Sequence, residues 1–199
     1  MTIKKFAEVV CETVGRNNQE FQVDERVVIA IAELLTATFI KNFLKNEKTI
    51  PSGYFQSFEM DVVTPATGRK YVVFDPPAMN IGDNDGFAYI GAIDDEMHIN
   101  SSYVILKQGQ LSAAAGLEAQ SLGGRPAVKP EGQKGYLYNE PPILDKLKVT
   151  QIAQLTELDE DDEMFGSDDI GALIFDKCIA YIKMKRGFKE DKQTDGQSN

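Results

Sequence analysis

The sequence predicts an α+β protein that has a helix pair at its start, an antiparallel β portion in the middle and one helix at its end. Three observations lead to this prediction. Apolar residues recur with helical spacing from Ile3 to Val14 and again from Val27 to Leu44. After Pro51 the pattern becomes extended, with aromatic and β-branched residues separated by turn-forming residues. Helical spacing then returns from Ile170 to Ile182.

Each N-terminal helix has a suitable first residue. Thr2 is a plausible N-cap for the first helix and Gly15 is a plausible end, while Asp24 is the expected N-cap of the second. The expected core stripe of the second helix consists of Val27, Val28, Ile31, Leu34, Leu35, Phe39, Phe43 and Leu44. Further apolar residues lie off that stripe, so this helix is expected to be buried on more than one side. The second covering surface could belong to another subunit.

The middle of the chain predicts a β-hairpin from residues 55–63 and 69–74, with residues 64–68 as the turn. The other expected strands are 87–93, 102–106, 135–139 and 147–155. Residues 108–134 are rich in glycine, contain two prolines and are expected to form a long loop, which in a compact domain is typical of an interaction arm. We therefore expect a single domain over residues 1–188, with the last helix closing at Gly187 and a polar tail at 189–199.

Composition limits the function classes. The chain of 199 residues has 21 basic and 31 acidic residues, a net charge of −10, which argues against broad binding to nucleic acid or to an anionic membrane. The most apolar window, 27–44, contains Glu33, Lys41 and Asn42 and is expected to be a poor membrane span. No secretory signal is visible, and the two cysteines, Cys11 and Cys178, lie in apolar helical stripes typical of buried thiols in a reducing compartment.

The sequence contains few of the residues that catalytic or metal sites commonly use. His98 is the single histidine, so a Ser-His-Asp or Cys-His arrangement would have to use it, and a zinc site lacks ligands. The chain contains neither a phosphate-binding P-loop nor a dinucleotide fingerprint. We therefore expect no enzyme activity, no cofactor and no metal.

The most distinctive segment runs from Glu157 to Asp169 and holds eight carboxylates directly before the last helix. Such a segment can bind a cation, repel a polyanion or start a helix while remaining solvated. An EF-hand loop that began at Asp159 would need glycine and glutamate where the chain has Met164 and Ile170, so that motif is excluded.

The order of segments resembles a known family. Two N-terminal helices lead into residues 53–62 (Gly-Tyr-Phe-Gln-Ser-Phe-Glu-Met-Asp-Val), and a turn leads into 68–77 (Gly-Arg-Lys-Tyr-Val-Val-Phe-Asp-Pro-Pro). Asn80-Ile81-Gly82 follows, and Leu158 to Glu163 precede the closing helix. This layout is similar to the small neck or ring proteins of tailed bacteriophages, especially short-tailed, crAss-like phages. The chain departs from the family pattern at residues 164–167 and in the insertion 108–130.

The resemblance implies a virion structural protein with no catalytic residues, located in the head-to-tail connector or tail and assembled in the host cytoplasm. It implies a homo-oligomeric ring of roughly twelve copies that docks to the portal and to adjacent connector or tail proteins. Genomic DNA would pass through without specific binding, and no membrane is involved. The interface or lumen candidates are Asp159, Glu160, Asp161, Asp162, Glu163, Phe39, Phe43, Leu111, Leu117 and Leu122.

Two other function classes stay open. An acidic protein-binding module, such as a DNA mimic or an assembly chaperone for a basic partner, would spread carboxylates over one face. In this chain they concentrate at 157–169 and 94–96. An enzyme with an unrecognised carboxylate site would need a pocket that holds a desolvated acid near His98.

Overall fold

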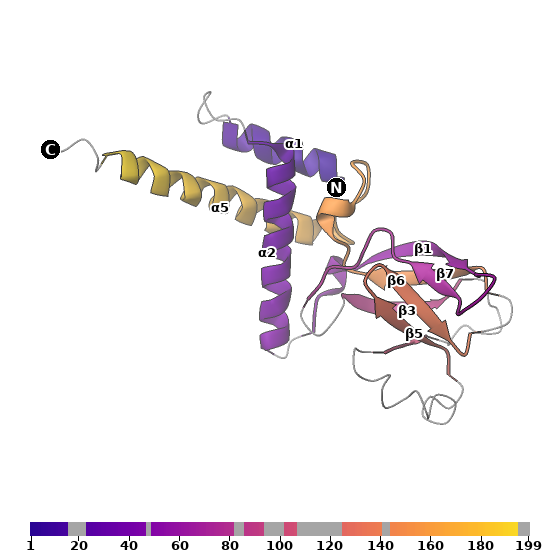
Figure 1. The fold of residues 1–199 in the computed structure, drawn as a ribbon. Coiled ribbons are helices and arrows are strands. Elements are labelled where there is room, and N and C mark those ends of the chain that lie inside the picture. Colours follow the sequence, from indigo (N-terminus) through magenta and orange to yellow (C-terminus); the bar gives the residue numbers. More distant parts are fainter. Residues whose placement is uncertain are drawn as a thin grey trace. The chain divides into compact units, whose positions relative to one another are not determined.

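The computed structural model describes residues 1–15, 23–46, 49–81, 86–93, 102–106, 125–140 and 144–194. The chain divides into two compact units. The helical unit combines residues 1–54 with the segment that begins at Leu155, and the sheet unit is Phe55–Gln154. The described residues form three α-helices and a seven-stranded, mostly antiparallel sheet, so the α+β prediction is confirmed (Figure 1). That the two units make one domain over 1–188 stays a prediction.

Helix α1 (Ile3–Gly15) follows its sequence pattern closely. The Thr2 Oγ1 accepts a hydrogen bond from the Lys5 amide at 3.3 Å, as an N-cap does. The predicted stripe is buried at Ile3, Phe6, Ala7, Val10 and Val14. Cys11, which was also expected to be buried, is half-buried. The Phe6 ring meets the Phe175 ring of α5 (Asp168–Thr194) edge to face, with centroids 6.1 Å apart.

Helix α2 (Glu25–Lys45) also begins where the sequence predicts. The Asp24 side chain accepts a hydrogen bond from the Arg26 amide at 2.8 Å. Farther along, the Glu33 carboxylate accepts bonds from the Thr156 amide at 2.9 Å and from its hydroxyl at 2.8 Å. The Glu33 carboxylate, a charged group in an otherwise apolar helix, therefore connects α2 to the short helix η2 (Leu155–Glu157).

The buried side of α2 differs from the predicted stripe. Its fully buried residues are Val28, Ala32, Thr36 and Ile40. Val27 and Leu34, which were expected in the core, are 49% and 55% exposed. The predicted stripe was chosen from the large apolar residues. The buried side instead includes Ala32 and Thr36, because their small side chains allow neighbouring elements to approach closely. The Thr36 hydroxyl costs little on this side because it donates to the Ala32 carbonyl at 2.8 Å.

Among the described residues, α2 is the one helix whose length and composition would allow it to cross a membrane. A core helix of a soluble protein passes the same test, so the observation is weak. In this structure α2 packs against α1 and α5.

Helix α5 has Asp168 and Asp169 in its first turn, which suits the helix dipole. It buries Ile174, Cys178 and Ile182, as the helical spacing predicts, whereas Leu173, which was also expected in the buried stripe, is 39% exposed. The prediction that it closes at Gly187 was wrong, because it continues to Thr194. Glycine ends a helix by adopting a left-handed conformation, and Gly187 does not adopt it. Residues 195–199 of the predicted tail lie outside the described residues.

The sheet has the strand order β3-β7-β1-β2-β6-β5-β4, in which only the pair β4–β5 is parallel. In chain order the strands are β1 (Gln56–Val63), β2 (Tyr71–Val73), β3 (Phe87–Ala92), β4 (Val104–Ile105), β5 (Ala127–Glu131), β6 (Lys134–Tyr138) and β7 (Lys146–Gln151). The predicted hairpin is confirmed, because β1 and β2 pair antiparallel with Val62 opposite Val72. Gly68 in its turn has a φ of 102°, which favours glycine.

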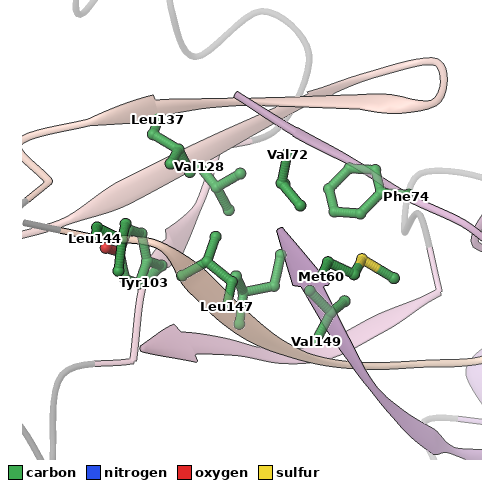
Figure 2. Close-up of a cluster of buried hydrophobic side chains, with 10 residues drawn as sticks. Met60, Val72, Phe74, Tyr103, Val128, Leu137, Leu144, Leu147 and Val149 are labelled. Atoms are coloured by element: carbon green, nitrogen blue, oxygen red, sulfur yellow. The ribbon is translucent and has the colours of Figure 1, made fainter. Parts of the chain in front are cut away.

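One face of the sheet forms the core of the sheet unit (Figure 2). Side chains alternate along each strand, so every second residue contributes. The core consists of Met60, Val72, Phe74, Ile90, Tyr103, Val128, Leu137, Leu144, Leu147 and Val149. Gly135 lies under the Phe74 ring, where a Cβ would come within 2.5 Å of a ring carbon, so a larger residue would displace that ring.

The expected loop 108–134 needs correction at its end, because Ala127–Glu131 form strand β5. Two prolines made this segment look irregular. Strand β4 pairs only with Ala127 and Val128 of β5. At Pro130 the one described partner strand of β5 is β6, so the N–H group that proline lacks is not needed for pairing with β4. Residues 107–124 lie outside the described residues.

Leu147→Ala is expected to destabilise the protein by about 2–5 kcal/mol, because Leu147 is fully buried opposite Met60 and its loss leaves a cavity. The same substitution at Leu173, which is 39% exposed, is the matched control and is expected to change stability by about 0.5 kcal/mol or less. Urea unfolding of both variants measures the difference. Equal losses would show that one of the two side chains is not where the structure places it.

Burial raises the pKa of the Cys178 thiol to about 12, against an ordinary value of 9.0. Because the folded pKa lies above the unfolded one, the contribution of this thiol to stability is complete below pH 9.0 and falls as the pH rises toward 12. We expect wild-type protein to lose more stability over that alkaline range than the Cys178→Ala variant. Unfolding curves at stepwise pH test this, and parallel curves would contradict it.

Candidate functional site

The acidic segment forms a turn between η2 and α5 and brings five of the predicted candidates together. Asp159, Glu160, Asp161 and Glu163 are exposed, and Asp162 is half-buried. We call residues 157–163 the acidic turn. Its exposure agrees with the prediction of a solvated turn ahead of a helix.

The backbone of the acidic turn binds the start of α1. The amides of Ile3 and Lys4 donate to the carbonyls of Asp162 at 3.0 Å and Glu160 at 3.1 Å. Thr2 forms a β-bridge with Glu163, and the Met164 amide donates to the Met1 carbonyl at 3.0 Å. The first N–H groups of a helix have no partner within it, and here the acidic turn supplies that partner. We call this set of backbone contacts the clasp.

The side chains of the acidic turn contribute less to this arrangement. The Asp162 carboxylate accepts a bond from the Asp159 amide at 3.0 Å and so closes the turn on itself. The Glu160 carboxylate pairs with the Lys4 ammonium at 3.3 Å, and this hydrogen bond and charge raise the pKa of Lys4. Both side chains of that pair are well exposed, so water screens their attraction.

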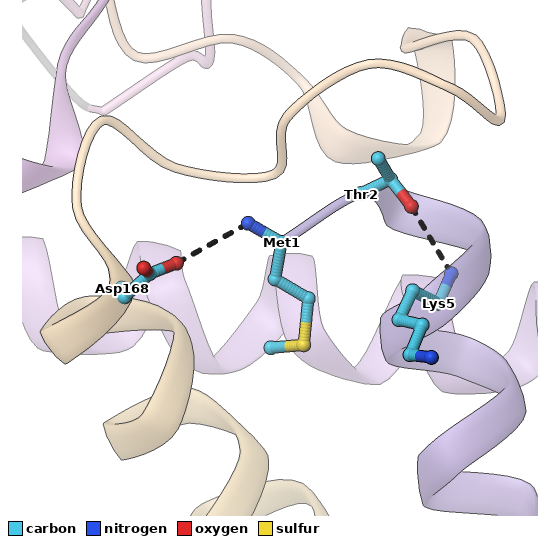
Figure 3. A network of polar contacts seen from close by, with 4 residues as sticks. All are labelled: Met1, Thr2, Lys5 and Asp168. Carbon is cyan, nitrogen blue, oxygen red and sulfur yellow. Dashed lines mark hydrogen bonds and ion pairs between the residues drawn. The ribbon is translucent and has the colours of Figure 1, made fainter.

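A second polar contact lies at the start of α5. The Met1 amino group pairs with the Asp168 carboxylate at 3.3 Å, next to the Thr2 cap of α1 (Figure 3). The carboxylates at the end of the segment therefore lie in the first turn of one helix, while the acidic turn adjoins the first turn of another. Both placements suit the positive end of a helix dipole.

The chemistry of the acidic turn is that of a helix start. In the part of the chain that the structure describes, no group of three or more His, Cys, Asp or Glu side chains is placed to hold a metal ion. Of the three uses that the sequence left open, the described contacts support helix initiation. The exposed carboxylates of Asp159 and Asp161 remain available to a partner.

The aromatic candidates of α2 have a structural role. The Phe43 ring meets the buried Tyr54 ring at 6.2 Å, and Tyr54 in turn meets Phe165 at 6.1 Å. Phe39 is half-buried. Both phenylalanines are thus half-buried in the helical unit, and an interface role for them stays a prediction. Leu111, Leu117, Leu122 and His98 lie outside the described residues.

An open groove of about 670 Å³ lies beside the acidic turn in the helical unit. It is lined by Ile3, Lys4, Ala7, Val23, Asp24, Glu25, Arg26, Ile29 and Glu160. Its lining combines charged side chains of both signs with apolar ones, and Asp24 in that lining already caps α2. This mixture indicates no particular ligand.

The sequence analysis missed a feature on the side of the sheet opposite its core. Tyr71 and Tyr136 lie opposite each other on β2 and β6, with ring centroids 6.1 Å apart. The Lys134 ammonium lies 4.8 Å from the centre of the Tyr71 ring, and the Arg69 guanidinium lies 4.0 Å from that of Tyr138. We call this surface the cation–tyrosine face, and it comprises Arg69, Tyr71, Lys129, Lys134, Tyr136 and Tyr138.

A signal for this face was present in the sequence. Arg69 and Tyr71, like Lys134, Tyr136 and Tyr138, alternate at a spacing of two, which places them on one side of their strands. The register that joins these strands is not visible in the sequence, and Lys129 and Lys134 were assigned to the loop.

Changing Asp159, Asp161 and Asp162 to Asn together is expected to cost less than about 1 kcal/mol of stability, because carbonyl groups make the clasp and exposed charges add little. Thr2→Ala, which removes the cap of α1, is expected to cost about 1 kcal/mol. Thermal unfolding at low salt compares the two variants. A larger loss in the triple variant would show that the carboxylates themselves hold the fold.

No protein-family model matches this chain, and no curated protein matches it.

Proposed function

We propose that this protein is a virion structural protein, a subunit of an oligomeric ring in a phage head-to-tail connector or tail. In this proposal the ring docks to the portal or to neighbouring rings and forms part of the conduit for DNA. The order of segments, which resembles that of phage neck and ring proteins, supplies the virion context. The observation that carries the oligomeric part is the apolar character of α2 on two sides.

One side of α2 packs within the helical unit through Val28, Ala32, Thr36 and Ile40. Val27 and Leu34, two helical turns apart, lie on another side and are 49% and 55% exposed. Large apolar side chains that gather on one surface are typical of interaction sites. In a ring each subunit buries one surface against the next, and this second side of α2 provides such a surface.

The charge of the chain suits a conduit for DNA. The net charge is −10, and most of the acidic turn is exposed. Affinity for DNA comes largely from contacts between basic side chains and phosphates, so an acidic surface lets the polymer slide without being held. The clasp fixes the backbone of the acidic turn and leaves most of its carboxylates in water.

We expect light scattering of the purified protein, alone and mixed with phage portal protein, to show a closed oligomer or a complex with the portal. The double variant Val27→Asp with Leu34→Asp should remain folded and lose this assembly, because it places charges on the second side of α2. Leu173→Asp on α5, at a position that is 39% exposed, is the control and should still assemble.

A wild-type monomer that ignores the portal would contradict the proposal. Capture of a basic protein by such a monomer would favour the acidic binding module instead.

A further inference from the structure

The cation–tyrosine face carries three basic side chains of the sheet unit. Among the described residues, Arg69, Lys129 and Lys134 lie there, and Glu131 pairs with Lys129. The neighbouring strands β1 and β7 present balanced charges on the same side of the sheet. Glu59 stands directly opposite Lys148, and Asp61 stands directly opposite Lys146. The face therefore gathers basic side chains on a chain whose net charge is −10.

The chemistry of this face favours carboxylates over nucleic-acid bases. Stacking of bases needs exposed aromatic ring faces. Here the Lys134 ammonium lies over the Tyr71 ring, and the Tyr138 ring, which is only 9% exposed, lies under the Arg69 guanidinium. A cation that lies over a ring is restrained in position, so it loses less freedom when it pairs with an anion. Tyr136 and Tyr138 also pack in a small apolar cluster with Leu106 and Ala127. The face thus presents positioned cations to an acidic partner.

The chain itself contains an acidic partner of this kind. The acidic turn presents the exposed side chains of Asp159, Glu160, Asp161 and Glu163 on a backbone that the clasp holds in place. The exposed carboxylates of this turn complement the exposed cations Arg69 and Lys134.

We propose that the acidic turn of one copy docks on the cation–tyrosine face of the next copy. The two surfaces are different, so the contact is heterologous and repeats from subunit to subunit, as a ring requires. The carboxylates accept hydrogen bonds from the Arg69 guanidinium and the Lys134 ammonium. This inference rests on the proposed function, because it supplies the polar contact of the ring whose apolar contact involves α2.

Charge reversal tests the proposal. The face variant combines Arg69→Glu with Lys134→Glu, and the turn variant combines Asp159→Lys with Asp161→Lys. Each is expected to weaken self-association by about tenfold or more, because attraction becomes repulsion at two positions. Sedimentation or light scattering across a concentration series gives the fold-change, and circular dichroism verifies folding. The control Lys177→Glu with Lys183→Glu changes the net charge as the face variant does, on exposed positions of α5, and should assemble like wild type.

Rescue separates a contact between copies from a contact within one chain. An equimolar mixture of the face variant and the turn variant places every reversed turn opposite a reversed face, so assembly should return. A single chain that carries all four substitutions should also assemble. Rescue in the single chain without rescue in the mixture would overturn the proposal, because the contact would then lie within one chain.

Other results identify which idea fails. If the wild type and both variants assemble equally, the docking inference is overturned while the ring proposal stands. If the wild type stays monomeric alone and with the portal, both are overturned. If a single-stranded oligonucleotide binds the wild type, loses binding in the face variant and leaves assembly of that variant intact, the face binds nucleic acid and the docking inference is overturned.

Discussion

The backbone hydrogen bonds of the clasp hold the helical unit together. This unit is built from two parts of the chain, residues 1–54 and the segment from Leu155 onward, that are separated by the whole sheet unit. Ile3 and Lys4 donate to carbonyls of the acidic turn, and Met164 donates back to Met1. These bonds fix the start of α1 beside the start of α5, where Phe6 and Phe175 then pack. Loss of the clasp would leave helix N–H groups without partners and would release the turn.

The clasp also separates the structural role of the acidic turn from its role toward partners. The fold uses mainly the carbonyl and amide groups, whereas most of the carboxylates remain exposed to water. An exposed carboxylate near a helix N-terminus is favourable at little cost, so charge can accumulate there without disturbing the core. The resulting surface is fixed in shape and strongly negative, which are the properties that docking on a cationic surface requires.

Local signals in the sequence predicted the elements well. Thr2 and Asp24 cap their helices because short side chains that accept hydrogen bonds satisfy the first N–H groups, and that rule needs no tertiary information. The buried side of α2 could not be predicted in this way, because Thr36 enters the core through a local bond to Ala32. Strand β5 was missed because Pro130 is tolerated only for reasons of strand position in the sheet.

The residues of the candidate site were predicted from the sequence, but the backbone contacts that they make were not. The sequence identified the acidic turn, yet the clasp depends on pairing between residues about 160 positions apart, which no local pattern reveals. The most direct measurement is amide hydrogen exchange at Ile3, Lys4 and Met164, in low salt and in about 1 M salt, where charges are screened beyond about 3 Å. Protection that persists at high salt is the expected result, because backbone bonds make the clasp. Protection that disappears with salt would contradict the account, because the carboxylate charges would then be holding the two segments together.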